Sequence, residues 1–307
     1  MTTLFFSLIA VLLAGGASPL QTAVNSRLRD FVDSPLVAAT VSFTIGTLIL
    51  IATTLLTEGT LAIPAETLHG LPWWSWLGGV VGLMFLTGNI FIFSHLGSVQ
   101  SAFLPVVGQI VMSMMIEQFG WFGSRAVPMT LSRGSGIILV MLGLMCYFSS
   151  KHKSTSAKGL LPWQILALLL GMVFATQPVM NGCQAALLGS GVHAALVSFL
   201  VSTVILYVLV FSLRKERPHL AKVFRRGKPL WTWSGGLLGA FLVTVMAIYT
   251  PLIGVGIVTL ASVLGMLLMS TVIDANGWFG AKAAKVSLRQ SLGLAVVVAG
   301  IALIKFA

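Results

Sequence analysis

Apolar runs of about 20 residues recur along the whole chain, and this feature restricts the fold more than any other. At about 1.5 Å per helical residue, each run is long enough to cross a hydrocarbon core about 30 Å thick. A helix also satisfies its own backbone hydrogen bonds, as the bilayer interior requires. The sequence therefore predicts an all-α integral membrane protein.

Composition agrees with this prediction. The chain is 57% hydrophobic and 8% charged, whereas soluble domains carry about 25% charged residues. Such a chain could not cover a water-exposed surface with polar groups. We expect ten transmembrane helices, at residues 3–25, 35–56, 73–94, 98–118, 130–149, 162–182, 193–213, 231–250, 254–274 and 287–306.

An internal duplication organises these ten helices into two sets of five. The stretch from Glu117 to Gly123 ends in Trp-Phe-Gly, and the same triplet closes the stretch from Asp274 to Gly280. Repeats of this kind indicate a duplicated architecture. The predicted units are an N-terminal five-helix repeat (1–150), a polar linker (151–159) and a C-terminal five-helix repeat (160–307).

An odd number of spans per repeat makes the second copy enter the membrane from the opposite side, giving two inverted five-helix repeats (5+5). Of the 18 Lys and Arg residues, 15 fall in loops on one side, and only Arg125, Arg133 and Lys305 fall on the other. The positive-inside rule places the basic side in the cytoplasm. Both termini are therefore predicted to be extracytoplasmic. The apolar N-terminal stretch lacks a positive n-region, so we interpret it as the first span and not as a signal peptide.

Several function classes lose support on the same grounds. The basic residues lie in short loops as topology signals, so no nucleic-acid partner is expected. Cys146 and Cys183 lie inside apolar runs, and no Cys/His cluster, Walker loop or nucleophile elbow is present. We therefore expect no cofactor, no metal and no enzymatic activity.

Taken together, the motifs resemble the drug/metabolite transporter superfamily and, more narrowly, its YdcZ-like family of bacterial inner-membrane proteins. The resemblance covers nearly the whole chain and rests on Gln21-x-x-x-Asn25, Trp74-x-Trp76-x-Gly78-Gly79, Gly108-Gln109 and the stretch from Glu117 to Gly123. It implies a transporter fold, here as a fused pair of units that many relatives carry singly. The second half departs from the pattern, with Gly265-Met266 where the first has Gly108-Gln109, and Glu117 stands where an aspartate is more usual. Better-known members of the superfamily keep both termini cytoplasmic, contrary to the charge count.

Candidate substrate-binding residues come from polar side chains inside the spans. Gln21 and Asn25 share a helical face beside Pro19, and Gln177 and Asn181 repeat this beside Pro178. Kinked helices at matching places in two halves are a sequence indicator of a transport site. The alternative is an ordinary kink whose amides cap free carbonyls.

A polar stripe on the fourth helix supplies Gln109, with Ser101, Ser113 and Glu117 on the same face. Facing lipid would be costly, so the stripe faces a cavity or another helix. Asn89 and Tyr249 are weaker cavity candidates.

Glu117 and Asp274 are the candidate coupling or gating residues. Each lies in the last turn of its helix, where the helix dipole disfavours an acid. Two interpretations remain: an interfacial acid that is hydrated or paired with an arginine, or a carboxylate that titrates or forms a gate. Because the repeats are inverted, the two acids are expected on opposite membrane faces.

These observations predict a secondary transporter that works by alternating access in the cytoplasmic (inner) membrane, as a monomer or homodimer in the lipid bilayer. No Lys or Arg lies near the middle of a span, so a neutral, zwitterionic or cationic small molecule is the expected substrate. Proton coupling through Glu117 or Asp274 is a hypothesis. The alternatives are a channel or a lipid-moving protein and, least favoured, a membrane enzyme.

Overall fold

The computed structural model describes residues 2–149, 159–223, 229–280 and 285–306. Of the predicted polar linker 151–159, all but Gly159 lie outside these residues. Every regular element within them is helical. Twelve α-helices are present there: α1 (Thr2–Val32), α2 (Pro35–Glu58), α3 (Ala65–Gly70), α4 (Gly78–Phe119), α5 (Leu131–Ser149), α6 (Leu161–Phe174), α7 (Thr176–Leu188), α8 (Gly191–Ser212), α9 (Arg217–Val223), α10 (Gly235–Ile253), α11 (Val255–Asn276) and α12 (Leu288–Phe306).

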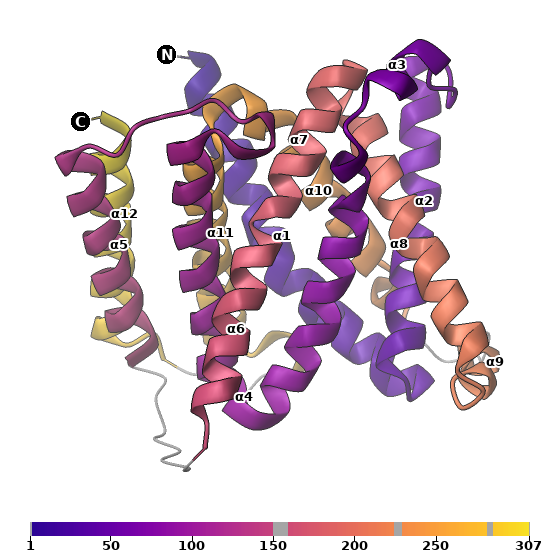
Figure 1. The fold of residues 1–307 in the computed structure, drawn as a ribbon. Coiled ribbons are helices and arrows are strands. Elements are labelled where there is room, and N and C mark those ends of the chain that lie inside the picture. Colours follow the sequence, from indigo (N-terminus) through magenta and orange to yellow (C-terminus); the bar gives the residue numbers. More distant parts are fainter. Residues whose placement is uncertain (1, 150–158, 224–228, 281–284, 307) are drawn as a thin grey trace.

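Four short 3₁₀ helices precede or follow the long helices. They occupy equivalent places in the two halves: η1 (Trp73–Leu77), η2 (Trp121–Gly123), η3 (Leu230–Trp233) and η4 (Trp278–Gly280). The bundle has both chain ends at one side, where α1 begins and α12 ends (Figure 1). From there α1 runs away from that side, whereas α6 and α7 run toward it (Figure 1).

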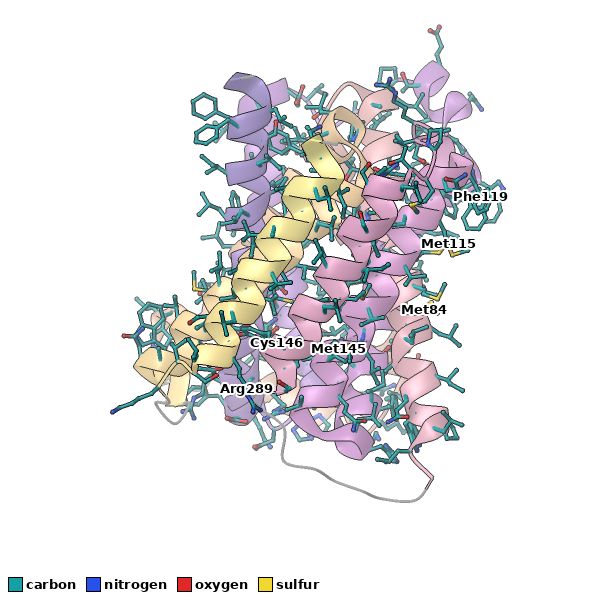
Figure 2. All side chains as sticks on the ribbon, turned by 90° about the vertical axis from the view of Figure 1, so that its left-hand side faces the viewer. Met84, Met115, Phe119, Met145, Cys146 and Arg289 are labelled. Atoms are coloured by element: carbon teal, nitrogen blue, oxygen red, sulfur yellow. The ribbon has the colours of Figure 1, made fainter. Side chains whose placement is uncertain are left out.

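The outside of the bundle is apolar, as a lipid-facing surface has to be. Within the described residues, nine segments are long and apolar enough to cross a membrane. Large apolar side chains project outward along their length, among them Met84, Phe119 and Met145, which are 48%, 60% and 58% exposed (Figure 2). The chain is therefore a multi-pass membrane protein.

One boundary differs from the sequence-based expectation. The predicted third and fourth spans, 73–94 and 98–118, join in a single helix, α4, of 42 residues. This helix folds back on itself near its middle (Figure 1). A Cβ added at Gly88 would lie 2.4 Å from the Leu170 side chain, and one at Gly108 would lie 2.1 Å from the Leu168 carbonyl oxygen. Both arms of α4 therefore pack on the same turn of α6.

Pro178 has the effect that its position predicts. Its ring nitrogen cannot donate a hydrogen bond to the carbonyl of Phe174, and the predicted sixth span divides into α6 and α7 at Ala175. In the first half, by contrast, α1 continues through Pro19 as one helix. The proline-associated break is therefore present in the second half alone.

Close packing between the halves holds the bundle together. In α1, a Cβ at Gly15 would lie 2.1 Å from the Ser262 carbonyl oxygen of α11. In the equivalent contact, one at Gly171 of α6 would lie 2.0 Å from the Pro105 carbonyl oxygen of α4. Glycine at these positions lets the helix backbones touch. The first helix of each half is thus seated against the other half.

The two Trp-Phe-Gly copies adopt the same backbone conformation. Gly120 and Gly277 both have φ of +65° and end α4 and α11 in the left-handed conformation that glycine favours. Phe122 and Phe279 follow, also with positive φ. Each phenylalanine ring contacts the tryptophan that precedes the third helix of its own half, with ring centroids 5.3 Å apart at Trp74 and 5.4 Å at Trp231.

Candidate functional site

The amides of the first helix lie against glycines of the other half. A Cβ built on Gly235 of α10 would lie 2.1 Å from Asn25 Oδ1, and one on Gly239 would lie 2.3 Å from Gln21 Nε2. Only glycine leaves room for these side chains. The Gly-Gly-x-x-Gly motif of the second half therefore forms a groove for the Gln-x-x-x-Asn motif of the first.

The reciprocal contact has the same form. Gln177 and Asn181 of α7 lie against Gly82 and Gly78 of α4, where an added Cβ would come within 2.6 Å of Gln177 Nε2 and 2.0 Å of Asn181 Oδ1. Asn181 also donates from Nδ2 to Ser198 Oγ of α8 at 3.4 Å. All four predicted amides thus lie at contacts between the halves, two at each contact.

The remaining predicted substrate-binding residues lie elsewhere. Asn89 and Gln109 are half-buried on the two arms of α4. Tyr249 is half-buried on α10, packed against an apolar cluster that includes Val11 and Val258. These three side chains are not among the residues that line the cavity described next.

A cavity of about 1250 Å³ lies instead at the end of the bundle that carries both termini. Its walls come from both halves: α1, α4, α5 and the loop after η2 on one side, and α7, α10, α11 and α12 on the other. Most of the lining is apolar, and the polar lining includes Ser7, Ser124, Thr250, Glu117, Arg125, Arg133 and Lys305. Of the nine predicted site residues, Glu117 alone lines it.

Glu117 joins three helices at this cavity. Its carboxylate pairs with the Arg133 guanidinium of α5, and the two side chains are 3% and 9% exposed. Its other oxygen accepts a hydrogen bond of 2.8 Å from the backbone N–H of Gly256, in the first turn of α11. A carboxylate at a helix N-terminus is favoured by the dipole and by the free N–H groups there. Glu117 of the first half therefore holds the start of α11 in the second.

Arg133 is itself held by the loop that precedes α5. Its Nη1 donates to the carbonyls of Val127 and Pro128, at 2.9 and 3.3 Å. Val127 in turn donates its N–H to the Glu117 carbonyl at 2.8 Å. The ion pair is thus part of a fixed corner that forms one wall of the cavity.

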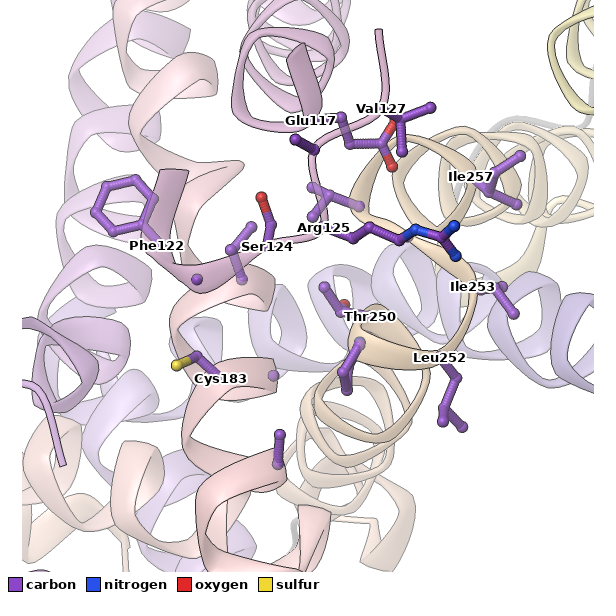
Figure 3. Close-up of a pocket in the computed structure, with 18 of the residues that line it drawn as sticks. Glu117, Phe122, Ser124, Arg125, Val127, Cys183, Thr250, Leu252, Ile253 and Ile257 are labelled. Carbon is purple, nitrogen blue, oxygen red and sulfur yellow. The ribbon is translucent and has the colours of Figure 1, made fainter. Parts of the chain in front are cut away.

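Arg125 is the cavity residue that sequence reasoning missed most clearly. It is exposed, lines the cavity, and its guanidinium extends toward the segment that joins α10 to α11, near Ile253 and Ile257 (Figure 3). Sequence reasoning counted Arg125 and Arg133 only as loop charges. The available signal was their spacing, eight and sixteen residues after Glu117. A Gly-rich turn lies between and reverses the chain, so residues after it can return to the side of the acid.

Asp274 lies at the other end of the molecule from Glu117. Glu117 contacts Gly256 in the first turn of α11, whereas Asp274 lies in the last turn of the same helix. At about 1.5 Å per residue these positions are about 27 Å apart. The position equivalent to Arg133 is Gln290, which is buried and bonded to Ser287. The position equivalent to Arg133 therefore carries an uncharged side chain, and the Glu117–Arg133 ion pair is not repeated there.

A multi-pass helical bundle, built from two related halves and enclosing a cavity between them, defines a protein of the membrane-transporter class. The comparisons with known proteins agree. The chain belongs to the YdcZ family of the drug/metabolite transporter superfamily, whose model, described as "Putative inner membrane exporter, YdcZ", matches residues 6–146 and again residues 162–303. The two matches confirm the duplication.

One solved structure, titled only as the crystal structure of a protein, is similar in fold. It shares 13% sequence identity with this chain, with a TM-score of 0.73, and the alignment covers 99% of this chain and 98% of that one. No curated protein matches the sequence.

Proposed function

We propose that the protein is a secondary transporter of the inner membrane, with ten spans arranged as two inverted five-helix repeats. The observation that carries this proposal is the cavity between the halves, at which an acid of one half holds the first turn of a helix of the other. Folding back of α4 supplies the third and fourth spans of the first half as two arms of one helix.

The cavity opens on the extracytoplasmic side in this proposal. It lies at the end that carries both termini, and the distribution of Lys and Arg residues supports an extracytoplasmic position for that end. In alternating access, this conformation is the outward-facing one. The two glycine grooves lie toward opposite ends of the bundle. Gln177 and Asn181 are on α7, whose Val179 and Gly182 line the cavity, whereas Gln21 and Asn25 lie in the second half of α1, toward the other end. In this proposal the groove at Gln21 and Asn25 closes the path to the cytoplasmic end.

A small zwitterionic molecule with an apolar part is the substrate class that fits best among those that the sequence leaves open. Arg125 offers an exposed guanidinium to a carboxylate, in a lining that is otherwise mainly apolar. The one carboxylate among the lining residues, that of Glu117, is already paired with Arg133. A neutral or purely cationic substrate has no carboxylate and would leave Arg125 unused.

Glu117 acts as a gating residue in this scheme. Moving α11 relative to α4 and α5 requires the bond to Gly256 N–H to break, because that bond crosses between the halves. Proton coupling follows if a proton from outside replaces Arg133 as the partner of Glu117 while the gate moves. Asp274 is proposed as the gating acid of the cytoplasmic end.

Reconstituted protein tests this proposal directly. Counterflow in liposomes should be observed with a neutral amino acid that has an apolar side chain, because a carrier exchanges substrate across the membrane. A channel or a lipid-moving protein would show no acceleration by trans-substrate. Arg125→Gln should weaken binding about tenfold, as expected for the loss of one charge-assisted hydrogen bond.

Arg29→Gln is the matched control, since Arg29 is exposed at the opposite end and bonds to Asp30. Its affinity should equal that of the wild type. Equal affinities for Arg125→Gln and the wild type would contradict the assignment of Arg125, and saturable transport of a phosphorylated metabolite would contradict the substrate class.

A further inference from the structure

Seven buried side-chain polar atoms have no hydrogen-bond partner among the described residues. Three of them, on Asn25, Ser42 and Asn181, lie at the glycine grooves. Asn25 and Ser42 are adjacent to Gly235, and Asn181 is adjacent to Gly78. Close contact with glycine Cα–H groups gives these oxygens a weak partner. The other four atoms have no such explanation: Thr54 Oγ1, Gln184 Oε1, Gln184 Nε2 and His193 Nε2.

These four atoms belong to three side chains. In the duplication, each of the three positions is equivalent to a residue of one apolar cluster at the other end of the molecule. Ser34 and Ser190 cap α2 and α8 in the same way, accepting from Val37 N–H and His193 N–H respectively. His193 is therefore the equivalent of Val37. By the same offset Gln184, three residues after Asn181, is equivalent to Leu28, three residues after Asn25.

The third equivalence follows from the contact between α2 and α8. Thr47 Oγ1 and Thr203 Oγ1 are 2.9 Å apart and occupy equivalent positions. Two helical turns further on, Thr54 in α2 corresponds to Val210 in α8. Leu28, Val37 and Val210 pack together in one apolar cluster with exposures of 1%, 0% and 0%.

The duplication therefore places Thr54, Gln184 and His193 together at the other end of the bundle, where α7 ends and α8 begins. All three are buried, with exposures of 0%, 0% and 8%. Leaving a buried polar atom without a hydrogen bond is destabilising, and four such atoms in one cluster would destabilise the fold more. Buried water makes about three hydrogen bonds to groups of this kind.

We propose that Thr54, Gln184 and His193 form an internal site that binds a small, neutral hydrogen-bonding molecule, and that this molecule is water. The site lies behind the cavity wall, because Cys183 on the neighbouring position of α7 lines the cavity. At the opposite end the equivalent residues seal α1 against α8 with apolar side chains. Water at this site leaves the end of α7 less tightly packed than its equivalent in α1, and this inference does not depend on the substrate.

Radiolytic footprinting of the purified full chain tests the site, because bound water converts to hydroxyl radical in place and oxidises the side chains it touches. Oxidation of His193, normalised to intrinsic reactivity, should be about tenfold faster than that of Tyr147, which is also buried but lies in an apolar cluster. Equal normalised rates would overturn the proposal.

Replacing two of the three partners with their first-half equivalents separates bound water from bulk solvent. Thr54→Val with Gln184→Leu should lower the His193 rate about fivefold, since the water loses two partners. Thr47→Val, which removes a hydroxyl outside the site, should leave the rate unchanged. An unchanged rate in the double variant would overturn the proposal. Loss of folding would raise the rate, and in that case Gln184→Leu alone is measured and has to lower it.

Discussion

Removing the charge of Glu117 should destabilise the protein strongly, because its partner cannot return to water. The Arg133 side chain is 9% exposed, and leaving one member of a buried ion pair alone costs about 3–5 kcal/mol. Arg133 keeps its bonds to Val127 and Pro128, so the lower half of this range is expected. We predict that Glu117→Gln lowers the free energy of unfolding by about 3 kcal/mol.

A double-mutant cycle needs a second variant, and the chain itself suggests Arg133→Gln. Gln290 occupies the position equivalent to Arg133 and is buried without a formal charge. Glu117→Gln combined with Arg133→Gln removes both charges together, so the loss should be smaller than that of either single variant. The coupling energy between the two sites should be at least about 2 kcal/mol.

Reversible unfolding in mixed detergent and SDS, followed by tryptophan fluorescence, measures these differences. Asp30→Asn is the control, because Asp30 is 49% exposed in its pair with Arg29 and such pairs contribute about 0–1 kcal/mol. If Glu117→Gln changes stability no more than Asp30→Asn, or if the two single losses simply add, the buried-pair reasoning is wrong.

Two further predictions concern packing and topology. Gly171→Ala should cost about 1–3 kcal/mol in the same unfolding assay, because its Cβ would lie 2.0 Å from the Pro105 carbonyl oxygen; Gly134→Ala, with open space around it, should cost nothing, and equal effects would contradict the close contact. In intact cells an impermeant maleimide should label Cys183, which lines the cavity, faster than Cys146, which bonds to the Arg289 carbonyl at the other end; the reverse order would invert the proposed topology.

Much of the fold could be predicted from local sequence. Apolar runs gave the long helices, because burial in lipid requires apolar length whatever the tertiary contacts are. Gly120 and Gly277 follow the predicted ends of two spans within three residues, where glycine commonly ends a helix, and both have the left-handed conformation. The joining of the third and fourth spans in α4 could not be predicted, since the fold-back is fixed by packing of both arms on α6.

The candidate site was harder to predict. Pairing of Glu117 with an arginine was one of the two interpretations left open, and Arg133 is that partner. The four amides are not among the residues that line the cavity of about 1250 Å³, and their role in binding stays a prediction. Their closeness to Gly78 and Gly235 depends on contacts between halves far apart in sequence. Helical periodicity shows which face a residue occupies but not what covers that face.

The two halves pack against each other within one chain, and this differs from the pairing of two separate identical chains. Two separate identical chains would carry the same residue at both equivalent positions, so an arginine beside one acid would always be matched by an arginine beside the other. Joining the copies in one polypeptide removes that constraint. Arg133 and Gln290 have diverged, as have Leu28 and Gln184, and each difference gives one end of the bundle a property that its opposite end lacks. The two ends of a fused pair can therefore differ, whereas those of a pair of identical chains cannot.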